Sequence, residues 1–404
     1  MADIPKIRFK GFTEPWEQRK LGEVFKEYSE KNHTELPALT IIQGGGTVKR
    51  EESDRNLMYD ESNLSNYKMV RKDDFIVHLR SFEGGLEKSL LDGIISPAYH
   101  TFHSDVADSR FYYPYFRSHE FIKHKLVPHV YGIRDGRSID IAGMKTIEIP
   151  YTSIEEQRKI GDYLESLDHL ITLHQRKCDD TKKLKKYMLQ KMFPKNGEKF
   201  PEIRFKGFTE AWEQRKLGDI YGSIGNAFVG TATPYYAEHG HFYLESNNVK
   251  DGQINHNAEI FINDEFYEKQ KDKWLHTGDM VMVQSGHVGH AAVIPEELDN
   301  TAAHALIMFR NPKEEIEPYF LNYEYQTDKA KKQIENITTG NTIKHILASD
   351  MQEFVVDIPK YEEQKAIAGY FCKLDHLITL HQRKCDTLKE LKKYMLQNMF
   401  PKKG

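Results

Sequence analysis

Apolar residues recur at alternating steps of four and three positions in two long stretches of the chain, residues 154–197 and 361–404. The spaced positions include Ile160, Leu164, Leu167, Ile171, His174 and Cys178 in the first stretch, and Ile367, Phe371, Leu374, Ile378, His381 and Cys385 in the second. Steps of four and three keep one side of an α-helix turned toward a partner helix, as in a coiled coil. The pattern therefore predicts two long helices that bury these residues in a common seam.

Both predicted helices have recognisable ends. A proline lies a few positions before each one, and glutamates at 155–156 and 362–363 fill the first turns, where they suit the helix dipole. Phe-Pro pairs at 193–194 and 400–401 end both helices. A helix of about 40 residues is roughly 60 Å long, and neither has a globular domain on which to bury its stripe along that length. We therefore expect an antiparallel coiled coil, with the two globular domains at its opposite ends.

The chain contains a long internal repeat. Residues 5–24 and 201–220 are identical at 16 of 20 positions, and residues 167–197 and 374–404 are identical at 26 of 31. A period near 200 residues is too long for a solenoid and indicates a tandem duplication. It predicts an internal pseudo-twofold within one chain.

Between the repeated segments the two halves diverge, because residues 25–148 and 221–357 show no such identity. The predicted order is a variable domain, a constant helix, a second variable domain and a second constant helix, with boundaries at 1–153, 154–197, 198–360 and 361–404. Near-identical ends around divergent middles indicate that the constant segments share one task and the variable domains have different ones. The alternative is a recent duplication without mechanical consequence.

The two variable domains have a common layout. In each, an aspartate turn leads into an apolar strand, followed by a Ser/Gly-rich loop and later by an aromatic cluster. These segments are 74–77, 80–85 and 111–116 in the first domain and 279–282, 284–289 and 318–323 in the second. Further strands are expected at 36–42, 68–72, 93–96, 242–246 and 305–309, and helices at 117–126 and 319–337. Short strands mixed with helices predict an α+β (mixed α/β) fold.

Composition places the chain among water-soluble globular proteins. Of its 404 residues 39% are hydrophobic and 29% charged, and the mean hydropathy is −0.66. An apolar run of about 18 residues, long enough for a membrane helix, does not occur, so no membrane partner is expected. The three cysteines form no CxxC pair, which favours a reducing cytoplasm over a disulfide-bonded protein.

Net charge argues at first against a nucleic-acid partner, since 57 basic residues face 61 acidic ones. The division along the chain refines this: the first variable domain has a net charge of −1, its helix +3, the second variable domain −10 and its helix +4. The excess of positive charge thus lies in the two helices, while the second variable domain is acidic.

Sequence motifs of catalysis are absent. The chain has no GxxxxGK[ST] phosphate loop, no HExxH, no GxSxG and no Asn/Asp-Pro-Pro-aromatic motif. The glycines at 44–46 do not form a GxGxxG motif, and a tight loop that lets backbone approach a ligand is the better interpretation.

His174 with Cys178, and their repeats His381 with Cys385, have the i, i+4 spacing of metal ligands. A seam role is preferred to zinc, so no catalytic residue, metal or cofactor is assigned.

Loops of the variable domains carry side chains suited to reading DNA. Arginine pairs with guanine, and asparagine or glutamine pairs with adenine. The candidate contacts are Gln43, Gly45, Lys49, Arg50, Arg80, Ser81, Arg134 and Arg137 in the first domain, and Asn247, Asn248, Lys250, Gln284, Ser285, His287, Asn341 and Lys344 in the second. Such residues also populate ordinary solvated turns, and only their matched placement in both halves favours a binding role.

The assembled pattern resembles the specificity subunits of Type I restriction–modification systems. The resemblance is carried by residues 12–24 and their copy 208–220, by the helix openings 149–168 and 358–375, and by the loop 278–289. It implies a subunit without catalysis of its own, whose two variable domains each read one half of a split, asymmetric site in double-stranded DNA. The helix pair would set the spacer and dock two methyltransferase subunits.

The same resemblance implies where the chemistry resides. The methyltransferase subunits would use S-adenosylmethionine to methylate adenine N6, and two ATP- and Mg-dependent restriction subunits would join them.

Two other classes of function remain as alternatives. One is a coiled-coil scaffold that binds only proteins. The other is an RNA-binding adaptor, for which Tyr235 and Tyr236 are the only loop candidates for base stacking.

Overall fold

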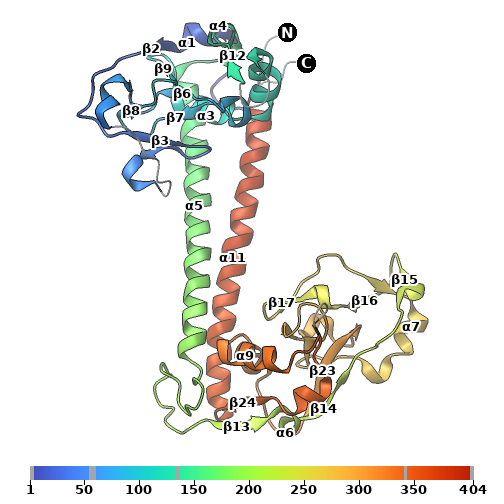
Figure 1. Ribbon diagram of the computed structural model, residues 1–404. Helices are drawn as coiled ribbons and strands as arrows, with labels where there is room; N and C mark the ends of the chain where they lie inside the picture. The colour runs from blue at the N-terminus through green and yellow to red at the C-terminus, as the bar shows by residue number, and fades with distance from the viewer. Residues whose placement is uncertain (1–3, 54–60, 133–136, 341–343, 401–404) are drawn as a thin grey trace. The chain divides into compact units, whose positions relative to one another are not determined.

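A computed structural model describes residues 4–53, 61–132, 137–340 and 344–400 (Figure 1). The chain forms two compact units: unit 1 comprises residues 1–175 and 383–404, and unit 2 comprises residues 176–382. Each unit therefore contains one globular region together with segments of both long helices. Two of the candidate DNA contacts, Arg134 and Asn341, lie outside the described residues.

The two long helices are α5 (Ile154–Lys191) and α11 (Tyr361–Met399), with 38 and 39 residues. Their contacts join Ile171 to Cys385 and Asp168 to Lys392 in unit 1, and Cys178 to Ile378 and Lys185 to Asp375 in unit 2. In each unit, contacts made by successive residues along α5 reach residues of decreasing number in α11. The helices are therefore antiparallel, which confirms the predicted packing.

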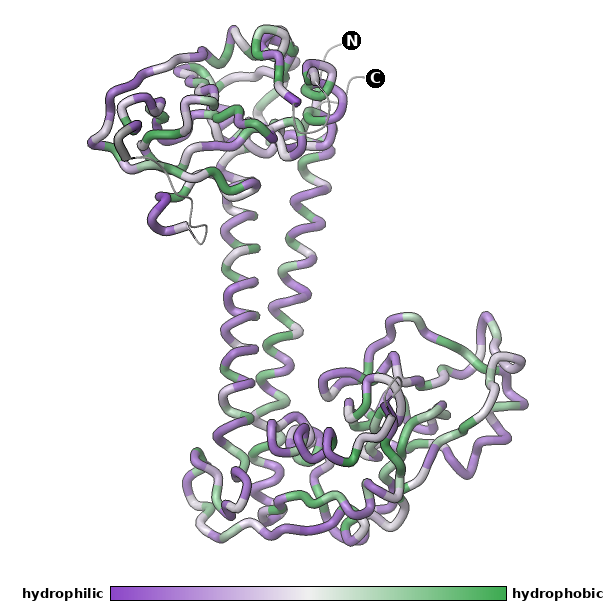
Figure 2. Tube along the Cα trace, viewed as in Figure 1, coloured by the Kyte–Doolittle hydropathy of each residue, from purple (hydrophilic) through white to green (hydrophobic). Residues whose placement is uncertain are grey.

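Burial along the helices follows the predicted stripe. Each of the twelve seam residues proposed from the sequence is buried or half-buried, and the residues between them are mostly exposed. Figure 2 shows the corresponding alternation of hydrophobic and hydrophilic positions along α5 and α11. The buried and half-buried positions of the two helices thus include all twelve of these residues.

The globular region of unit 1 is built on a four-stranded antiparallel sheet of order β2-β9-β6-β7. Its strands are β1 (Glu17–Lys20), β2 (Lys26–Tyr28), β3 (Leu39–Ile42), β4 (Gly46–Lys49), β5 (Lys68–Val70), β6 (Phe75–Val77), β7 (Glu87–Lys88), β8 (Gly93–Ile95), β9 (His100–His103), β10 (Val130–Tyr131), β11 (Ser138–Ile139) and β12 (Glu148–Tyr151). Its helices are α1 (Leu21–Val24), α2 (Ser81–Gly84), α3 (Ser109–Phe116) and α4 (Ile141–Lys145), with a π-helical segment at Glu120–Leu126.

Unit 2 is built on two four-stranded sheets, of order β14-β23-β20-β21 and β15-β19-β16-β22. Its strands are β13 (Glu213–Lys216), β14 (Tyr221–Asn226), β15 (Tyr236–Ala237), β16 (His241–Leu244), β17 (Val249–Lys250), β18 (Gln253–Ile254), β19 (Phe261–Ile262), β20 (Met280–Val283), β21 (Ala291–Val293), β22 (Ala302–Ala303), β23 (Leu306–Pro312) and β24 (Val355–Ile358). Its helices are α6 (Leu217–Ile220), α7 (Asp264–Glu268), α8 (Pro318–Glu324), α9 (Asp328–Ile337) and α10 (Ala348–Gln352).

The two units share an internal frame despite their divergent sequences. The order β2-β9-β6-β7 in unit 1 corresponds to β14-β23-β20-β21 in unit 2, and the ladder β1–β12 corresponds to β13–β24. Trp16 packs on Phe111 at a ring separation of 5.5 Å, and Trp212 packs on Phe320 at the same separation. The predicted common layout and the predicted α+β fold are confirmed.

Two predicted helices differ from those in the structure. The aromatic cluster 111–116 belongs to α3, and the helix expected at 117–126 begins only at Glu120. The helix expected at 319–337 is divided into α8 and α9, because Thr327 caps α9 by accepting from the amide of Ala330. Among the described helices, none combines the length and apolar character needed to cross a membrane.

Candidate nucleic-acid interface

In unit 1 a glycine turn presents the first candidate residues. Gln43, Gly44 and Gly45 form the tip of the hairpin between β3 and β4 and are exposed. The turn closes through the Gly45 amide, which donates to the Ile42 carbonyl over 2.9 Å. Gly44 and Gly46 have φ values of 85° and 73°, a region that favours glycine because it lacks a Cβ. The sequence thus places backbone and one amide side chain at an exposed tip.

A buried carboxylate holds this tip. Glu87 on β7 accepts hydrogen bonds from the backbone amides of Gly44 (2.7 Å) and Gly46 (3.2 Å). The Tyr113 hydroxyl donates to the same carboxylate over 2.7 Å, and the Arg117 guanidinium pairs with it. The Glu87 side chain is 0% exposed, so its negative charge is balanced within the fold rather than by solvent.

The Ser/Gly-rich segment 80–85 lies beside the tip and contains the short helix α2. A Cβ on Gly84 would stand 2.1 Å from the Gln43 Nε2 atom, so the missing side chain allows the two loops to touch. The Arg137 guanidinium stands 5.7 Å from the centre of the Phe82 ring. Gln43, Arg137 and the exposed Arg80 are therefore gathered on neighbouring loops of unit 1.

Other candidates in unit 1 are placed differently. Ser81 is buried, and its hydroxyl accepts from the His78 amide over 2.9 Å. Burial also lowers the pKa of His78 below its ordinary value. Lys49 and Arg50 lie at the opposite end of β4 from the tip, where Lys49 pairs with Glu52 at 3.6 Å. Ser81 therefore positions its loop, and the two basic residues stand apart from the tip.

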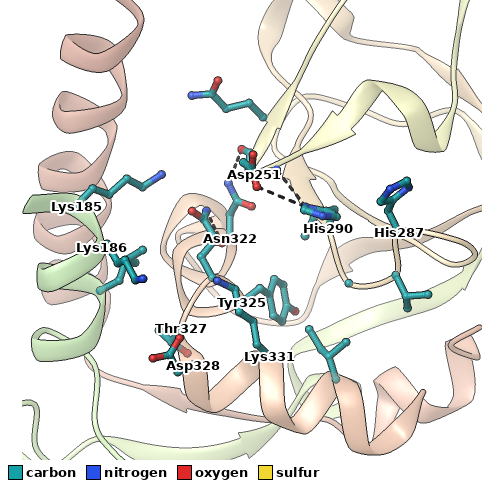
Figure 3. A pocket seen from close by; sticks show the side chains of 18 of the residues that line it. Lys185, Lys186, Asp251, His287, His290, Asn322, Tyr325, Thr327, Asp328 and Lys331 are labelled. Carbon is teal, nitrogen blue, oxygen red and sulfur yellow. Dashed lines mark hydrogen bonds and ion pairs between the residues drawn. The ribbon is translucent and has the colours of Figure 1, made fainter. Parts of the chain in front are cut away.

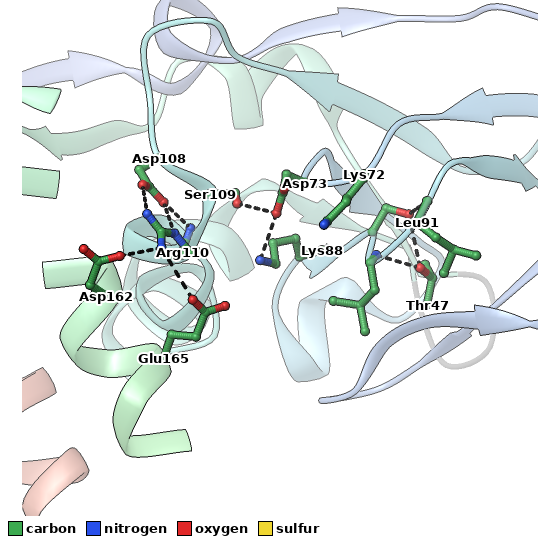
Figure 4. Close-up of polar contacts among 12 residues, drawn as sticks. Thr47, Lys72, Asp73, Lys88, Leu91, Asp108, Ser109, Arg110, Asp162 and Glu165 are labelled. Carbon is green, nitrogen blue, oxygen red and sulfur yellow. Dashed lines mark hydrogen bonds and ion pairs between the residues drawn. The ribbon is translucent and has the colours of Figure 1, made fainter. Parts of the chain in front are cut away.

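A cleft of about 580 Å³ in unit 1 is occupied by internal ion pairs (Figure 4). Arg110 pairs with Asp108, Asp162 and Glu165, and so ties α3 to α5. On the other side Asp73 accepts from Lys88 at 3.0 Å and from the Ser109 hydroxyl at 2.9 Å. These charges connect the globular region to the helix, and we assign the cleft a structural role.

Unit 2 contains a larger cleft of about 960 Å³ (Figure 3). Lysines of α5 line one side of it, and the loop 286–290 lines the other. Its main polar lining residues are Lys182, Lys185, Lys186, Asp251, His287, His290, Asn322, Tyr325, Asp328, Lys331 and Lys344. Two lining residues carry buried polar atoms without a hydrogen-bond partner among the described residues, the Oδ1 atom of Asn322 and the hydroxyl of Tyr325. The cleft thus brings several basic side chains together within an otherwise acidic domain.

Two loops that are distant in sequence form one wall of this cleft. The Gly286 amide donates to the Lys344 carbonyl over 3.1 Å, and the Ile346 amide donates to the Gln284 carbonyl over 3.0 Å. The candidates Gln284, Ser285, His287 and Lys344 are therefore adjacent. His287 and Lys344 are exposed, whereas Gln284 and Ser285 are half-buried. The structure thus joins the Ser-Gly loop to the later Gly turn.

The turn between β17 and β18 meets the same wall. The Asp251 amide donates to His290 Nδ1 over 3.2 Å, and the Asn322 side chain donates to the Gly252 carbonyl over 2.8 Å. Lys250 is exposed beside this turn, and Asn247 is exposed just before it. Asn248 is buried: its Oδ1 accepts from the Glu245 amide, and its Nδ2 donates to backbone carbonyls of the following turn. Asn248 therefore shapes the loop.

Several residues that organise these surfaces were not predicted. Glu87, Tyr113 and Asn322 hold the loops, and Lys182 and Lys186 line the larger cleft. The sequence offered no local signal for Glu87, since β7 consists of Glu87 and Lys88 and both side chains are charged. Lys182 and Lys186 lie near the end of α5, where basic residues also suit the C-terminal end of the helix dipole, so their type alone does not indicate a cleft.

The cysteines of the seam make polar contacts across the helix pair. The Cys178 thiol lies 3.7 Å from the side-chain oxygen of Gln382, and the Cys385 thiol lies 3.5 Å from that of Gln175. Within the residues that the structure describes, no group of three or more His, Cys, Asp or Glu side chains is arranged to hold a metal ion. The thiols therefore face amide and carbonyl oxygens in a seam geometry.

Comparison with known proteins identifies relatives. The sequence pattern of the family described as "Type I restriction modification DNA specificity domain" matches residues 13–182 and 209–390. The "Type I restriction enzyme MjaVIII specificity subunit" of Methanocaldococcus jannaschii is 24% identical over 266 residues, covering 64% of this chain and 62% of the relative. The "Putative type I restriction enzyme MjaX specificity subunit" of the same organism is 26% identical over 270 residues, covering 64% and 60%. The chain thus spans about three fifths of the length of these curated relatives.

The fold has a counterpart among solved structures. The crystal structure of the S subunit of a Type I restriction–modification system from M. genitalium superposes with a TM-score of 0.62 at 14% sequence identity, covering 99% of this chain and 100% of that one. At this identity the likeness is one of fold. The family pattern matches more than half of the chain and falls once on each half of the duplication. The chain therefore belongs to the family of Type I restriction–modification DNA specificity proteins.

Proposed function

We propose that the chain is the DNA specificity subunit of a Type I restriction–modification complex, and that each globular region reads one half of a split DNA site. The observation that carries this proposal is the family pattern, which occurs twice in one chain on two frames that hold different loops. Symmetric proteins read palindromes. A single chain with two different readers suits an asymmetric site.

The exposed loop residues supply base readout in this proposal. In unit 1 these are Gln43, Arg80 and Arg137, which suit adenine and guanine edges. In unit 2 they are Asn247, Lys250, His287 and Lys344, around the larger cleft. Lys182 and Lys186 on the opposite side of that cleft are suited to phosphate oxygens, which position a duplex without reading its sequence. Base contacts and backbone contacts are thus divided between loops and helix.

The helix pair would set the distance between the half-sites and carry the partner subunits. Beside the buried seam each unit exposes a second apolar set: Leu170, Leu173, Leu391 and Tyr394 in unit 1, and Leu184, Tyr187, Leu377 and Leu380 in unit 2. These side chains are 36–55% exposed. Exposed apolar residues gathered in this way mark interaction surfaces. Two sets of the same composition suit two copies of one partner, the methyltransferase subunit.

Chemistry would then belong to the partners. Methyltransferase subunits would bind S-adenosylmethionine and modify adenine N6, and two restriction subunits would bind ATP and magnesium. The chain itself would supply no catalytic residue. The second variable domain has a net charge of −10, so we expect the isolated chain to bind DNA weakly. High affinity with a steep salt dependence should arise only in the complex.

Co-expression with the methyltransferase subunit of the same system, followed by mapping of N6-methyladenine across the host genome, tests the proposal. The expected result is methylation at one split motif with two unlike halves. A palindromic or continuous motif would contradict the two-reader arrangement. Absence of sequence-specific methylation and of a DNA footprint with an active methyltransferase present would favour the protein-only scaffold.

A further inference from the structure

The Glu87 carboxylate lies at the meeting point of an exposed tip and a buried frame. It is 0% exposed and has four donors: two backbone amides of the tip, one hydroxyl and one guanidinium. Hydrogen bonds to a charged acceptor are about twice as strong as neutral ones. Removal of the carboxylate would also leave buried donors without partners. Glu87 therefore determines where the Gly44–Gly46 backbone lies.

The three glycine amides of the tip all have acceptors within unit 1. Gly44 and Gly46 donate to Glu87, and Gly45 donates to the Ile42 carbonyl. Glycine alone has wide conformational freedom, so a Gly-Gly-Gly turn without such bonds would sample many backbone states. The bonds to Glu87 fix one of them. The Gln43 side chain extends from this fixed turn and lies against Gly84.

The other two donors connect Glu87 to the constant part of the unit. Tyr113 lies on α3, and Arg117 follows this helix directly. Phe111 of α3 packs on Trp16, and the Asp108 amide donates to the Gln157 side chain of α5 over 3.0 Å. The chain of contacts therefore runs from the long helix through α3 to Glu87 and ends at the hairpin tip.

Unit 2 uses the equivalent helix position for the same purpose. Tyr113 lies two positions after Phe111, and Asn322 lies two positions after Phe320, the matching ring on Trp212. Tyr113 donates to Glu87, and Asn322 donates to the Gly252 carbonyl in the turn between β17 and β18. In both units this helix position thus links the shared frame to a variable turn.

We propose that Glu87 is a positioning residue for sequence readout by unit 1, which holds the tip so that Gln43 and the Gly45 backbone meet a base edge in one fixed orientation. The inference rests on the proposed function of unit 1 as a reader of DNA. Glu87 touches no DNA itself; it acts through the tip. Its removal should relax the choice of base in one half-site and leave the other half-site unchanged.

Amide hydrogen exchange of the isolated chain, selectively labelled at glycine, tests the structural step without DNA. In Glu87→Ala the exchange rates of the Gly44 and Gly46 amides should rise at least about tenfold, as expected for loss of a charged acceptor. The Gly45 amide, bound to Ile42, should change much less. Tyr113→Phe removes only one donor and should give a smaller rise at the same two amides. Unchanged rates at Gly44 and Gly46 in Glu87→Ala would overturn the proposal.

Methylation mapping tests the readout step, with Asp74→Asn as the matched control. Asp74 is another buried carboxylate of unit 1, but it holds Tyr28 and His103 instead of the tip. We expect Glu87→Ala and Glu87→Gln to methylate sites that vary at one or more positions of a single half-site, whereas Asp74→Asn keeps the wild-type motif even at a lower melting temperature. An unchanged motif in both Glu87 variants, or equal relaxation in Asp74→Asn, would overturn the proposal. A wild-type complex without a split motif would instead contradict the proposed function.

Discussion

The Trp16 indole Nε1 donates to the Glu156 carboxylate over 3.0 Å, in the first turn of α5. The same carboxylate forms a two-point ion pair with Arg8, at 2.6 and 2.8 Å. In the second copy Arg204 and Glu363 repeat the two-point ion pair, at 2.6 and 2.7 Å. The indole there differs, because the Nε1 atom of Trp212 is buried without a partner among the described residues. Two nearly identical sequences thus have unequal hydrogen bonding.

This difference predicts unequal losses in a matched pair of variants. Trp16→Phe removes ring area and a hydrogen bond to a charged group, whereas Trp212→Phe removes similar ring area and an unsatisfied donor. The first variant should therefore lose about 2 kcal/mol more of unfolding free energy than the second. Hydrogen exchange of peptides from β12 and β24 reports each unit separately. Equal losses of unfolding free energy in the two variants would show that the hydrogen bond from Trp16 to Glu156 does not stabilise the fold.

A second pair of variants compares two ion pairs of the seam. Lys185 and Asp375 are 11% and 15% exposed, while Lys392 and Asp168 are 24% and 55% exposed. Asp375→Asn leaves a largely buried ammonium, and also removes an acceptor of the Tyr323 hydroxyl. It should lower unfolding free energy by about 3 kcal/mol, against at most about 1 kcal/mol for Asp168→Asn. Urea unfolding measures both, and a larger loss in Asp168→Asn would contradict the burial argument.

The two long helices could be predicted because the 4,3 spacing persists along both of them, and local propensity cannot easily override a signal of that length. The helix at 109–116 was missed because Pro114 stands inside it. Proline breaks a helix by leaving the carbonyl four residues earlier unbonded, and here the helix ends two residues later. The division at Thr327 did have a signal, since a threonine before an aspartate is a common helix cap.

The candidate site was predicted only in part, for a different reason. Exposed loop residues such as Gln43 and His287 follow from turn chemistry, which is local in sequence. Glu87 is 43 positions from Gly44, and Asn322 is 70 positions from Gly252. Such contacts depend on the sheet order, which one sequence does not specify. Burial of Ser81 and Asn248 likewise depends on neighbours distant in the chain.

A pH prediction concerns the buried carboxylate of Asp74. His103 Nδ1 lies 2.5 Å from Asp74 Oδ1, and this hydrogen bond raises the pKa of His103 above its ordinary value. A raised pKa in the folded state means that protonated His103 stabilises the fold at pH below the unfolded value of about 6.5. The stabilisation is lost as pH rises through the higher folded pKa. The melting temperature of His103→Asn should therefore lie furthest below wild type in mild acid, and the two should converge in mild alkali.

At each pH the melting temperature of the variant is compared with that of the wild-type protein. The contributions of other groups that titrate in this range then cancel. Burial lowers the pKa of His78 and of His290, and both act in the opposite direction in either protein. A difference in melting temperature that stays constant across this range would contradict the role of His103.

Exchange of one variable domain predicts an effect on one half-site. Replacing residues 25–148 by another domain of the family should change only the half of the motif that unit 1 reads. One contact across the junction, from the Asp108 backbone amide to Gln157, does not depend on the side chain brought in. The ion pairs of Arg110 with Asp162 and Glu165 do depend on it, so the replacement domain should keep an arginine at this position. Genome-wide N6-methyladenine mapping measures the result. A change in both halves would contradict the modular arrangement.

A last prediction concerns the length of the helix pair. Insertion of four residues after Leu173 shifts the rest of α5 by about one helical turn. With α11 unchanged, the contacts Ile171–Cys385 of unit 1 and Cys178–Ile378 of unit 2 cannot both be kept. The insertion should lengthen the spacer of the methylated motif or abolish activity. Full activity with an unchanged spacer would rule out the helix pair as the ruler.

Insertion of seven residues in both helices, after Leu173 and after its repeat Leu380, is the matched test. Seven residues preserve the phase of the seam, and equal insertions preserve the antiparallel register. The pair should then be longer by about 10 Å, close to three base pairs at about 3.4 Å each. We expect an active complex whose two half-sites keep their sequences and stand about three base pairs further apart. The change in helical phase of the DNA can lower the rate of methylation, but methylated sites at the original spacing would contradict the prediction.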